Sequence, residues 1–401
     1  MEDNRQYANV GASHAPPPHP VGEHHEPKPE KPRRHWNRIG LFLIILGAIM
    51  LGIGWIAGAR GGSLVWENGR MRVLSVASRT STDYTIPNSN TIREITIESS
   101  SARVTVEPTN SSNDPITVSI VNMENYNIQH TATSLTVNTR FHQGVTNFQF
   151  IGVGFYQPRQ EIIVRIPANQ ADSITITASS GGVRAESVNA TQWMVNSSSG
   201  GVRVANIQAE SFSAQASSGG VQLSNIQAET FSARTTSGGV RLDNIQAETF
   251  SANSTSGSVQ MNNVQVESLN AGSTSGGIRG ANVHFTVGNI GNTSGGVNLS
   301  NVSWVNLNAR TVSGSLRVTN AYIHSGHIVN AQTNLSATSG GVRLELRNSS
   351  NHFNYSLTST SGSRRVDGNR FGGRGTNSGG SGNHPITLQS ISGGVRLNFN
   401  S

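Results

Sequence analysis

Apolar and polar residues alternate in short runs from Val183 onward, and the same run returns every 19 residues. Alternation with a period of two is typical of a β-strand that buries one face. The first apolar position of the run holds Val183, Val202, Val221, Val240, Val259, Ile278, Val297 and Leu316. The second, two residues later, holds Val204, Leu223, Leu242, Met261, Leu299 and Val318.

A second alternating run follows in each repeat and combines a large apolar residue with a small one. The large position holds Trp193, Phe212, Phe231, Phe250, Leu269 and Leu307, and the small position holds Ala214, Ala233, Ala252, Ala271 and Ala309. One 19-residue unit cannot bury both runs alone, whereas units stacked in register share a core and complete each other's backbone hydrogen bonds. We therefore predict an all-β fold, a parallel β-solenoid of 19-residue coils.

A Ser-Gly-Gly or Ser-Gly-Ser motif separates the repeats. Its first glycine falls at Gly181, Gly200, Gly219, Gly238, Gly257, Gly276, Gly295 and Gly314, and the wider spacing of Gly340, Gly362 and Gly393 indicates loop insertions near 321–333 and 364–386. We expect these glycines to supply turn angles that a side chain would forbid. A phosphate-binding loop is excluded because no Gly-Lys-Ser/Thr follows, and a calcium-binding β-roll would need recurring aspartates.

An asparagine recurs at the opposite corner of each repeat. Stacked side-chain amides can hydrogen-bond along a solenoid axis, and asparagine tolerates turn conformations. We predict a structural asparagine ladder made of Asn206, Asn225, Asn244, Asn263, Asn282, Asn301 and Asn320.

The segments before the repeats divide by composition. Residues 91–176 hold short alternating runs between Asn, Ser and Pro turns, so we predict an irregular β region that starts the solenoid, with regular repeats over 177–401. Residues 60–90 are predicted to be a linker. Residues 1–38 are rich in proline and histidine and poor in large apolar residues, which predicts a disordered tail.

Residues 39–59 contain no charged side chain, and a helix of that length would span about 31 Å, the thickness of a bilayer core. We predict an uncleaved transmembrane helix. Basic residues concentrate before it, so the positive-inside rule places the N-terminus in the cytoplasm and the solenoid outside the cell. Gly54 and Gly58 form a GxxxG pair through which two such helices could associate.

Composition narrows the function classes. Only 13% of residues are charged and 44 are glycine, which disfavours a helical bundle. The absence of cysteine excludes disulfides, thiolate metal sites and cysteine catalysis. The net charge of +7 favours anionic partners.

One outward position, between the two apolar positions of the first run, is rich in arginine. It holds Arg184, Arg203, Arg241, Arg279, Arg317, Arg343, Arg365 and Arg396, with Gln222, Gln260 and Asn298 in the remaining repeats. Outward arginines can simply keep a β surface soluble. Alternatively, regularly spaced guanidinium groups can bind a repeating polyanion, such as a cell-wall polymer, a host surface glycan or extracellular nucleic acid without sequence specificity. A shorter acidic position holds Glu210, Glu229, Glu248 and Glu267, which we interpret as a solvated turn.

No group of residues predicts catalysis. The histidines are scattered, aspartates are few, and the many serines lack a nearby histidine with an orienting acid. His324 and His327 lack a third metal ligand, so their spacing is a weak signal. We expect a protein that is not an enzyme, with no catalytic, cofactor-binding or metal-binding residue and no cofactor.

Three segments, residues 91–108, 160–167 and 173–176, together with the serial Ser-Gly-Gly-Val-Arg turns, resemble the bacterial putative-adhesin family with β-strand repeats. The resemblance implies a right-handed parallel solenoid, often tethered to a membrane, and sometimes an association with envelope-stress systems. The final coil, which ends in Val395-Arg396-Leu397, lacks an obvious cap and would leave an edge open to another solenoid.

We therefore expect a membrane-anchored, extracellular binding module. The alternative is a structural, self-assembling or sensory partner of an envelope-stress system, associating through the solenoid end or through Gly54 and Gly58.

Overall fold

The computed structural model describes residues 35–56, 63–67, 70–74, 80–139, 159–324, 331–372 and 374–400. The chain separates into two compact units, residues 1–62 and 63–401, which we describe in turn. The predicted tail lies almost entirely outside the described residues, as do Gly58 and His327.

Helix α1 of the first unit runs over His35–Ile56 and overlaps most of the uncharged segment 39–59. Its described apolar side chains, among them Leu41, Phe42 and Ile44, are exposed. Within the described residues, however, no helix is long and apolar enough to cross a membrane. The predicted transmembrane helix therefore has no support from the structure.

The second unit begins with strands in the segment that we predicted to be a linker. Strands β1 (Ser63–Glu67) and β2 (Arg70–Leu74) form an antiparallel pair. Strand β3 (Ser81–Thr85) follows and joins the main sheet.

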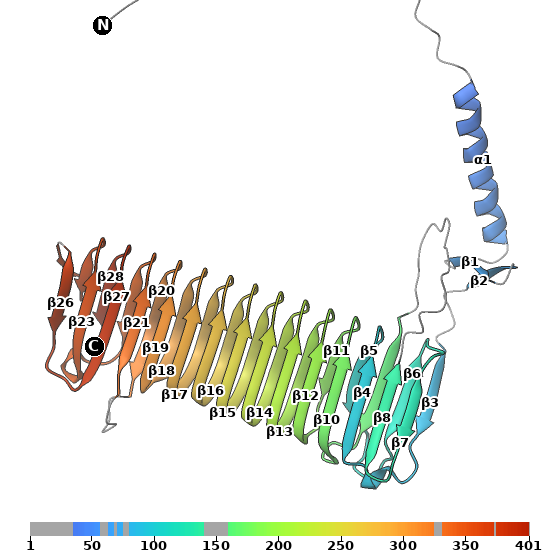
Figure 1. Ribbon diagram of the computed structural model, residues 1–401, viewed down its shortest axis with the longest axis horizontal. Helices are drawn as coiled ribbons and strands as arrows, with labels where there is room; N and C mark the ends of the chain where they lie inside the picture. Colours follow the sequence, from blue (N-terminus) through green and yellow to red (C-terminus); the bar gives the residue numbers. More distant parts are fainter. Residues whose placement is uncertain are drawn as a thin grey trace, which may run out of the picture. The chain divides into compact units, whose positions relative to one another are not determined.

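The rest of the second unit is a row of stacked coils (Figure 1). In the central coils each strand lies parallel to the next, and outside the asparagine and glutamate corners each residue pairs with the residue 19 positions later, as Val202 does with Val221. The predicted all-β parallel stack is confirmed, whereas its right-handed sense stays a prediction. The central strands are β10 (Ala171–Ala178), β11 (Val183–Glu186), β12 (Ala190–Ser197), β13 (Val202–Ala216), β14 (Val221–Thr235), β15 (Val240–Ser254), β16 (Val259–Ser273), β17 (Ile278–Asn292), β18 (Val297–Trp304), β19 (Asn306–Thr311) and β20 (Leu316–Ile323).

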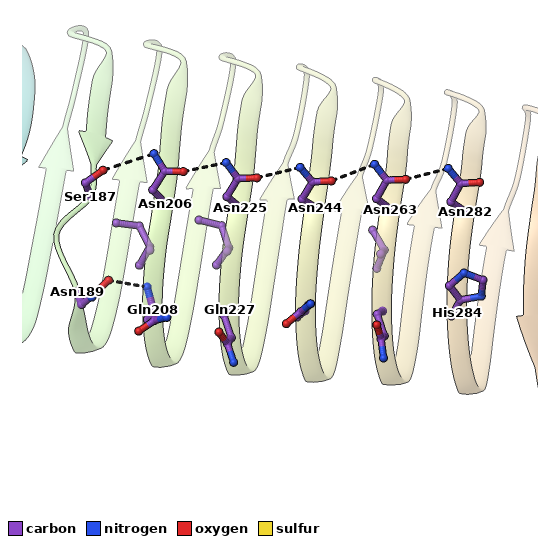
Figure 2. Close-up of a pocket in the computed structure, with 15 residues that line it drawn as sticks. Ser187, Asn189, Asn206, Gln208, Asn225, Gln227, Asn244, Asn263, Asn282 and His284 are labelled. Carbon is purple, nitrogen blue, oxygen red and sulfur yellow. Dashed lines mark hydrogen bonds between the residues drawn. The ribbon is translucent and has the colours of Figure 1, made fainter.

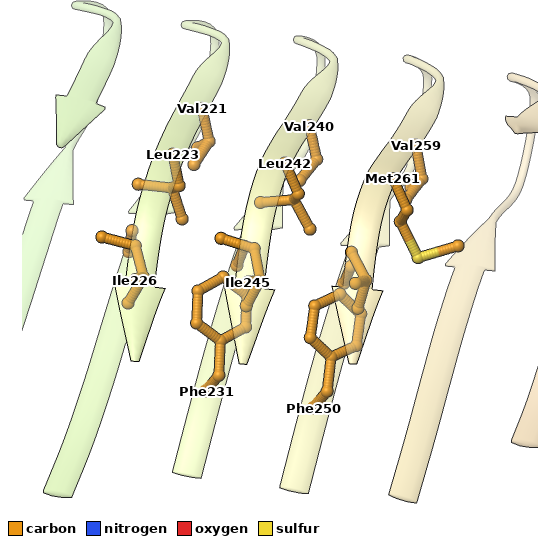
Figure 3. Packing of buried hydrophobic residues seen from close by; sticks show 14 of the residues in the cluster. Val221, Leu223, Ile226, Phe231, Val240, Leu242, Ile245, Phe250, Val259 and Met261 are labelled. Carbon is orange, nitrogen blue, oxygen red and sulfur yellow. The ribbon is translucent and has the colours of Figure 1, made fainter. Parts of the chain in front are cut away.

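The apolar positions predicted from the alternation are buried between the walls of each coil (Figure 3). Phe231 stacks on Phe212 and Phe250 of the neighbouring coils, with ring centroids 5.6 and 5.1 Å apart. A further buried position escaped the sequence pattern: Ile226 follows Leu223 by three residues rather than two. Asn225, one of the two residues between them, has a φ of 54°, and this left-handed bend turns Ile226 inward.

The order of coils at the N-terminal end differs from the order of the chain. The coil of β4 and β5 lies between the outer coil of β8 and β9 and the coil of β10 and β11. Strand β7 pairs antiparallel with β8, and β6 and β3 continue antiparallel from β9, so they cover the outer edge. The bounds are η1 (Ser89–Thr91), β4 (Glu94–Ser99), β5 (Arg103–Pro108), β6 (Thr117–Val121), β7 (Asn127–His130), β8 (Ser134–Thr139) and β9 (Glu161–Ile166).

The C-terminal end has the same reversal, and it corrects two predictions. The last coil of the chain, β27 and β28, lies between the coil of β21 and β22 and the coil of β23 and β24. Strands β26 and β25 then pair antiparallel with β23 and β24. The bounds are β21 (Thr333–Ala337), β22 (Val342–Leu346), η2 (Ser350–His352), β23 (Phe353–Ser359), β24 (Arg364–Val366), β25 (Asn369–Phe371), β26 (Gly375–Gly379), β27 (His384–Ser390) and β28 (Val395–Phe399).

The expected open edge at Val395-Arg396-Leu397 is thus wrong, because β28 is paired on both sides. The predicted loop insertion near 364–386 is also wrong in kind, because much of it forms the strands that cover the outermost coil. The motif spacing shows which residues form a coil but not where that coil docks, since all coils present similar edges.

The role predicted for the glycines needs correction as well. Among the described glycines, positive φ angles occur at Gly368, Gly375 and Gly380, none of which belongs to the turn motifs that recur with the coils. The first glycine of each motif is required for space instead: a Cβ on Gly219 would lie 2.0 Å from the carbonyl oxygen of Gly200 in the preceding coil. The left-handed corner is the asparagine corner, where φ is 52° to 58°.

A buried polar position, not predicted from the sequence, ties several of the glycine turns to their neighbours. The hydroxyl of Ser254 donates to the carbonyl oxygen of Gly238 at 2.9 Å and accepts from the N–H of Gly257 at 2.9 Å. Ser273 and Ser390 form equivalent pairs of bonds. These bonds satisfy backbone groups that the turn would otherwise bury without partners.

Candidate functional site

The arginine row is the set of residues at the outward position between the two buried positions of the first run. In spatial order it comprises Arg184, Arg203, Gln222, Arg241, Gln260, Arg279, Asn298, Arg317, Arg343, Arg396 and Arg365. Each member pairs in register with the next, so the structure brings all eight predicted arginines into one line. The order of the last two is the reverse of their order in the sequence.

Local acids and amides hold the arginines of the N-terminal half. Arg184 pairs with Glu186 and Arg241 with Asp243, both at 3.0 Å, and Arg203 donates to the amide oxygen of Gln222 at 2.8 Å. These arginines are exposed, and exposed ion pairs contribute little to stability. Their guanidinium groups stay available to solvent and to a ligand.

A groove runs beside the arginine row, because the neighbouring position in each coil is the second glycine or serine of the turn motif. Arg184 and Arg203 line one stretch of it, with a volume of about 370 Å³. Arg279 and Arg317 line a second stretch of about 270 Å³. A third stretch, of about 430 Å³, is lined by Arg317, Arg343, Arg365 and Arg396. The second glycine therefore leaves room beside the guanidinium groups. From the sequence, this residue is expected to serve only the turn.

The predicted asparagine ladder lies at the left-handed corner (Figure 2). The side-chain amide of Asn225 donates to the side-chain oxygen of Asn206 at 2.8 Å, and Asn244 donates to Asn225 at 2.9 Å. The same bond continues to Asn263, Asn282, Asn301 and Asn320, at 2.6 to 3.3 Å. Each bond joins two coils at the surface.

A second groove, the amide groove, lies between this ladder and a row of outward glutamines that the sequence analysis did not single out (Figure 2). Its volume is about 770 Å³, and its glutamine side is formed by Gln208, Gln227, Gln246 and Gln265, followed by His284. Ile207, Ile226 and Val264 form part of its floor. The groove offers neutral hydrogen-bonding groups at the spacing of the coils.

The acidic position lies at the third corner of the coil. Glu210 and Glu229 are exposed and fall where the pairing between neighbouring strands is interrupted, as expected for a turn. Glu248 and Glu267 occupy the same position in the next coils.

Titratable groups in the described ranges do not gather into a catalytic arrangement. No group of three or more His, Asp or Glu side chains that could hold a metal occurs among them. His324 lies edge-on to Tyr322, with ring centroids 4.9 Å apart. His384 is buried, and burial lowers its pKa to about 4.

The architecture defines a class: a parallel β-solenoid built on a repeated Ser-Gly-Gly turn, with grooves on its outer faces. The family model of Toastrack DUF4097 matches residues 92–263 and 243–398. The chain belongs to this family.

Solved structures with weak similarity carry names that refer to adhesion or to lipid binding. They include a putative cell adhesion protein from Clostridium sporogenes, 8% identical with a TM-score of 0.23, over 80% of this chain and 99% of that one. A putative adhesin from Parabacteroides merdae is 11% identical with a TM-score of 0.31, and a putative lipid binding protein from Parabacteroides distasonis is 10% identical with a TM-score of 0.29; each match covers 80% of this chain and 97% of the other. No curated protein matches the chain.

Proposed function

We propose that this protein is a non-catalytic surface module that holds an anionic polymer of the cell envelope, or an anionic host glycan, along its arginine row. One observation supports the proposal above the others: the arginines form a single line across successive coils and border a groove free of large side chains. A linear polyanion can lie in such a groove and contact many guanidinium groups, each contact being weak alone and strong in sum.

The spacing of the central arginines suits reversible binding. Gln222, Gln260 and Asn298 separate them, so charged side chains lie about two strand spacings, or about 9.6 Å, apart. This distance is near the physiological screening length of about 8 Å. Repulsion within the row is reduced, while Arg203, Arg279 and Arg317 still line the groove.

We also propose that the protein is attached to the cell membrane by residues 39–59, with the solenoid outside the cell. The support is the sequence alone: 21 residues without a charge, preceded by a basic segment. Extraction of cell membranes with alkaline carbonate tests this. The full chain should stay in the pellet, and a chain lacking residues 39–59 should be released; release of both would refute membrane attachment.

The polymer proposal is tested with isolated envelopes. The variant Arg203→Gln, Arg241→Gln, Arg279→Gln and Arg317→Gln should lose retention at low salt, whereas the wild-type protein should be retained and then eluted by salt. The matched control changes Glu210, Glu229, Glu248 and Glu267 to Gln on another corner and should be retained at least as well. Unchanged retention of the arginine variant would overturn the proposal.

A further inference from the structure

Five arginines occupy equivalent positions on five neighbouring strands at the C-terminal end of the solenoid. Arg317 of β20 pairs with Arg343 of β22, Arg343 with Arg396 of β28, Arg396 with Arg365 of β24, and Arg365 with Arg370 of β25. Residues opposite each other in neighbouring strands project to the same face. We call these five residues the C-terminal arginine patch.

The patch concentrates positive charge more than any other part of the arginine row. No glutamine or asparagine separates its members, and neighbouring strands lie about 4.8 Å apart, well inside the screening length of about 8 Å. Like charges at this distance destabilise a sheet unless something compensates them.

Few acidic side chains of the protein neutralise the positive charge of the patch. Glu345 accepts a hydrogen bond from the Nε of Arg343 at 2.6 Å. Asp367 accepts instead from the backbone N–H of Phe399, at 2.7 Å. Among the described residues, no ion pair joins an acid to Arg317, Arg365, Arg370 or Arg396.

The surroundings of the patch are shaped to receive an anion. Arg343, Arg365 and Arg396 are partly buried, and Arg365 Nε is buried without a hydrogen-bond partner in the described part of the chain. Four members of the patch line the groove of about 430 Å³, next to Gly341 and Gly394, which have no side chains to block it. Buried guanidinium donors without acceptors are uncommon, and phosphate oxygens satisfy them in pairs.

We propose that the C-terminal arginine patch is a phosphate-binding site that takes consecutive phosphate groups of a linear phosphate polymer. This inference rests on the proposed function, because both require an anionic polymer in the groove, but it assigns the strongest binding to one end of the row and to one chemistry. The central arginines then contact the rest of the polymer more weakly.

The test compares two triple variants of the full-length chain in mild nonionic detergent micelles. The patch variant is Arg365→Gln, Arg370→Gln and Arg396→Gln, and the matched control, which removes the same charge from the other end, is Arg184→Gln, Arg203→Gln and Arg241→Gln. The probe is fluorescently labelled inorganic polyphosphate. We expect binding to weaken at least tenfold in the patch variant and less than threefold in the control, with the log–log salt slope of the patch variant reduced by about 2.

Several outcomes decide between the two proposals. Equal weakening in both variants would overturn the patch and leave the proposed function standing, since the whole row would then bind uniformly. Retention of the wild-type protein on envelopes without polyphosphate binding would likewise overturn the patch alone. Failure of the wild-type protein to bind either would overturn both.

A second pair of variants covers the case in which the triple Gln variant does not fold. Arg396→Lys and Arg365→Lys keep the charge but lose the two-pronged guanidinium geometry, so they should weaken polyphosphate binding severalfold while leaving the urea midpoint unchanged. Binding equal to that of the wild-type protein would show that charge alone acts there, and the phosphate-specific site would be rejected.

Discussion

Arg343 and Arg396 are direct neighbours in the sheet, although another coil of the chain lies between them in sequence. The last coil has been inserted between two coils that the chain completed earlier. The stack therefore does not end where the chain ends, and the consequences of truncation differ from those in a solenoid built in chain order.

Removal of residues 384–401 should unfold the C-terminal end of the solenoid rather than shorten it. The coil of β23 and β24 would lose its parallel partner, and the edges of β21 and β22 would be exposed. Removal of residues 221–239, one complete 19-residue unit, should be tolerated, because β13 would then meet β15 in the same register. Urea unfolding and light scattering measure both; a truncated chain as stable and monomeric as the wild-type protein would contradict this prediction.

The asparagine corner should tolerate glycine better than alanine. Asn244 has a φ of 58° and takes part in two ladder bonds, with Asn225 at 2.9 Å and Asn263 at 3.0 Å. Asn244→Ala loses the bonds and strains the backbone, so its free energy of unfolding should fall by about 2 kcal/mol. Asn244→Gly loses the bonds alone and should fall by about 1 kcal/mol. Urea unfolding distinguishes the two, and equal losses would show that the backbone angle is unimportant there.

The two glycines of one turn should differ sharply in their tolerance of alanine. A Cβ on Gly219 would lie 2.0 Å from the Gly200 carbonyl oxygen, whereas on Gly220 it would lie 3.4 Å from the Gly239 oxygen. Gly219→Ala should lower the free energy of unfolding by about 3 kcal/mol, because the coils must move apart. Gly220→Ala is the matched control and should change it by less than about 0.5 kcal/mol. If both alanines were equally harmful, the requirement would lie in the turn conformation rather than in close stacking.

His384 should make the C-terminal coils sensitive to acid. Its Nε2 lies 3.0 Å from the hydroxyl of Thr333, and its Nδ1 is buried without a partner in the described residues. The indole N–H of Trp304 donates to the same hydroxyl. Burial lowers its pKa from 6.5 to about 4. Between these values the unfolded chain binds a proton that the folded chain does not, so stability is full above pH 6.5 and falls as the pH drops towards 4.

The size of this effect is about 1.4 kcal/mol per pH unit, or about 3 kcal/mol over the whole window. Urea unfolding at pH 7 and pH 5 measures it, and His384→Gln serves as the control because glutamine does not titrate. The difference between the wild-type protein and the variant should shrink or reverse at pH 5. A difference that does not depend on pH would show that folding does not shift the pKa of His384.

The repeated coil was predictable because its signal is summed over many copies. The position shared by Val202, Val221 and Val240 defines a strand that no single unit would establish. The buried position of Ile226 was not predictable from alternation, because the left-handed bend at Asn225 shifts the inward phase by one residue. The line of arginines was predictable from the repeat, because residues at the same position of successive coils stack on one another.

The arrangement of both ends was beyond the sequence analysis. Val395 and Val342 look alike in the pattern, and nothing in their spacing shows that the coil of Val395 docks directly against that of Val342. Arg370 was missed because it does not follow a repeat motif and joins the arginines only through an antiparallel pairing with Arg365. Docking is decided by contacts between coils distant in sequence, which a periodic pattern does not contain.

The covered ends also determine how such a protein can vary in length. Because both outer coils are covered by strands folded back from within the chain, a coil added at either terminus cannot pair directly with the outermost coil. A duplication of 19 residues in the middle leaves both covers untouched and moves them apart by about 4.8 Å. The near-identical units around Ile207, Ile226 and Ile245 are what repeated internal duplication would leave behind. The length of the solenoid can therefore change by whole coils during evolution, while the strands that cover its two ends stay the same.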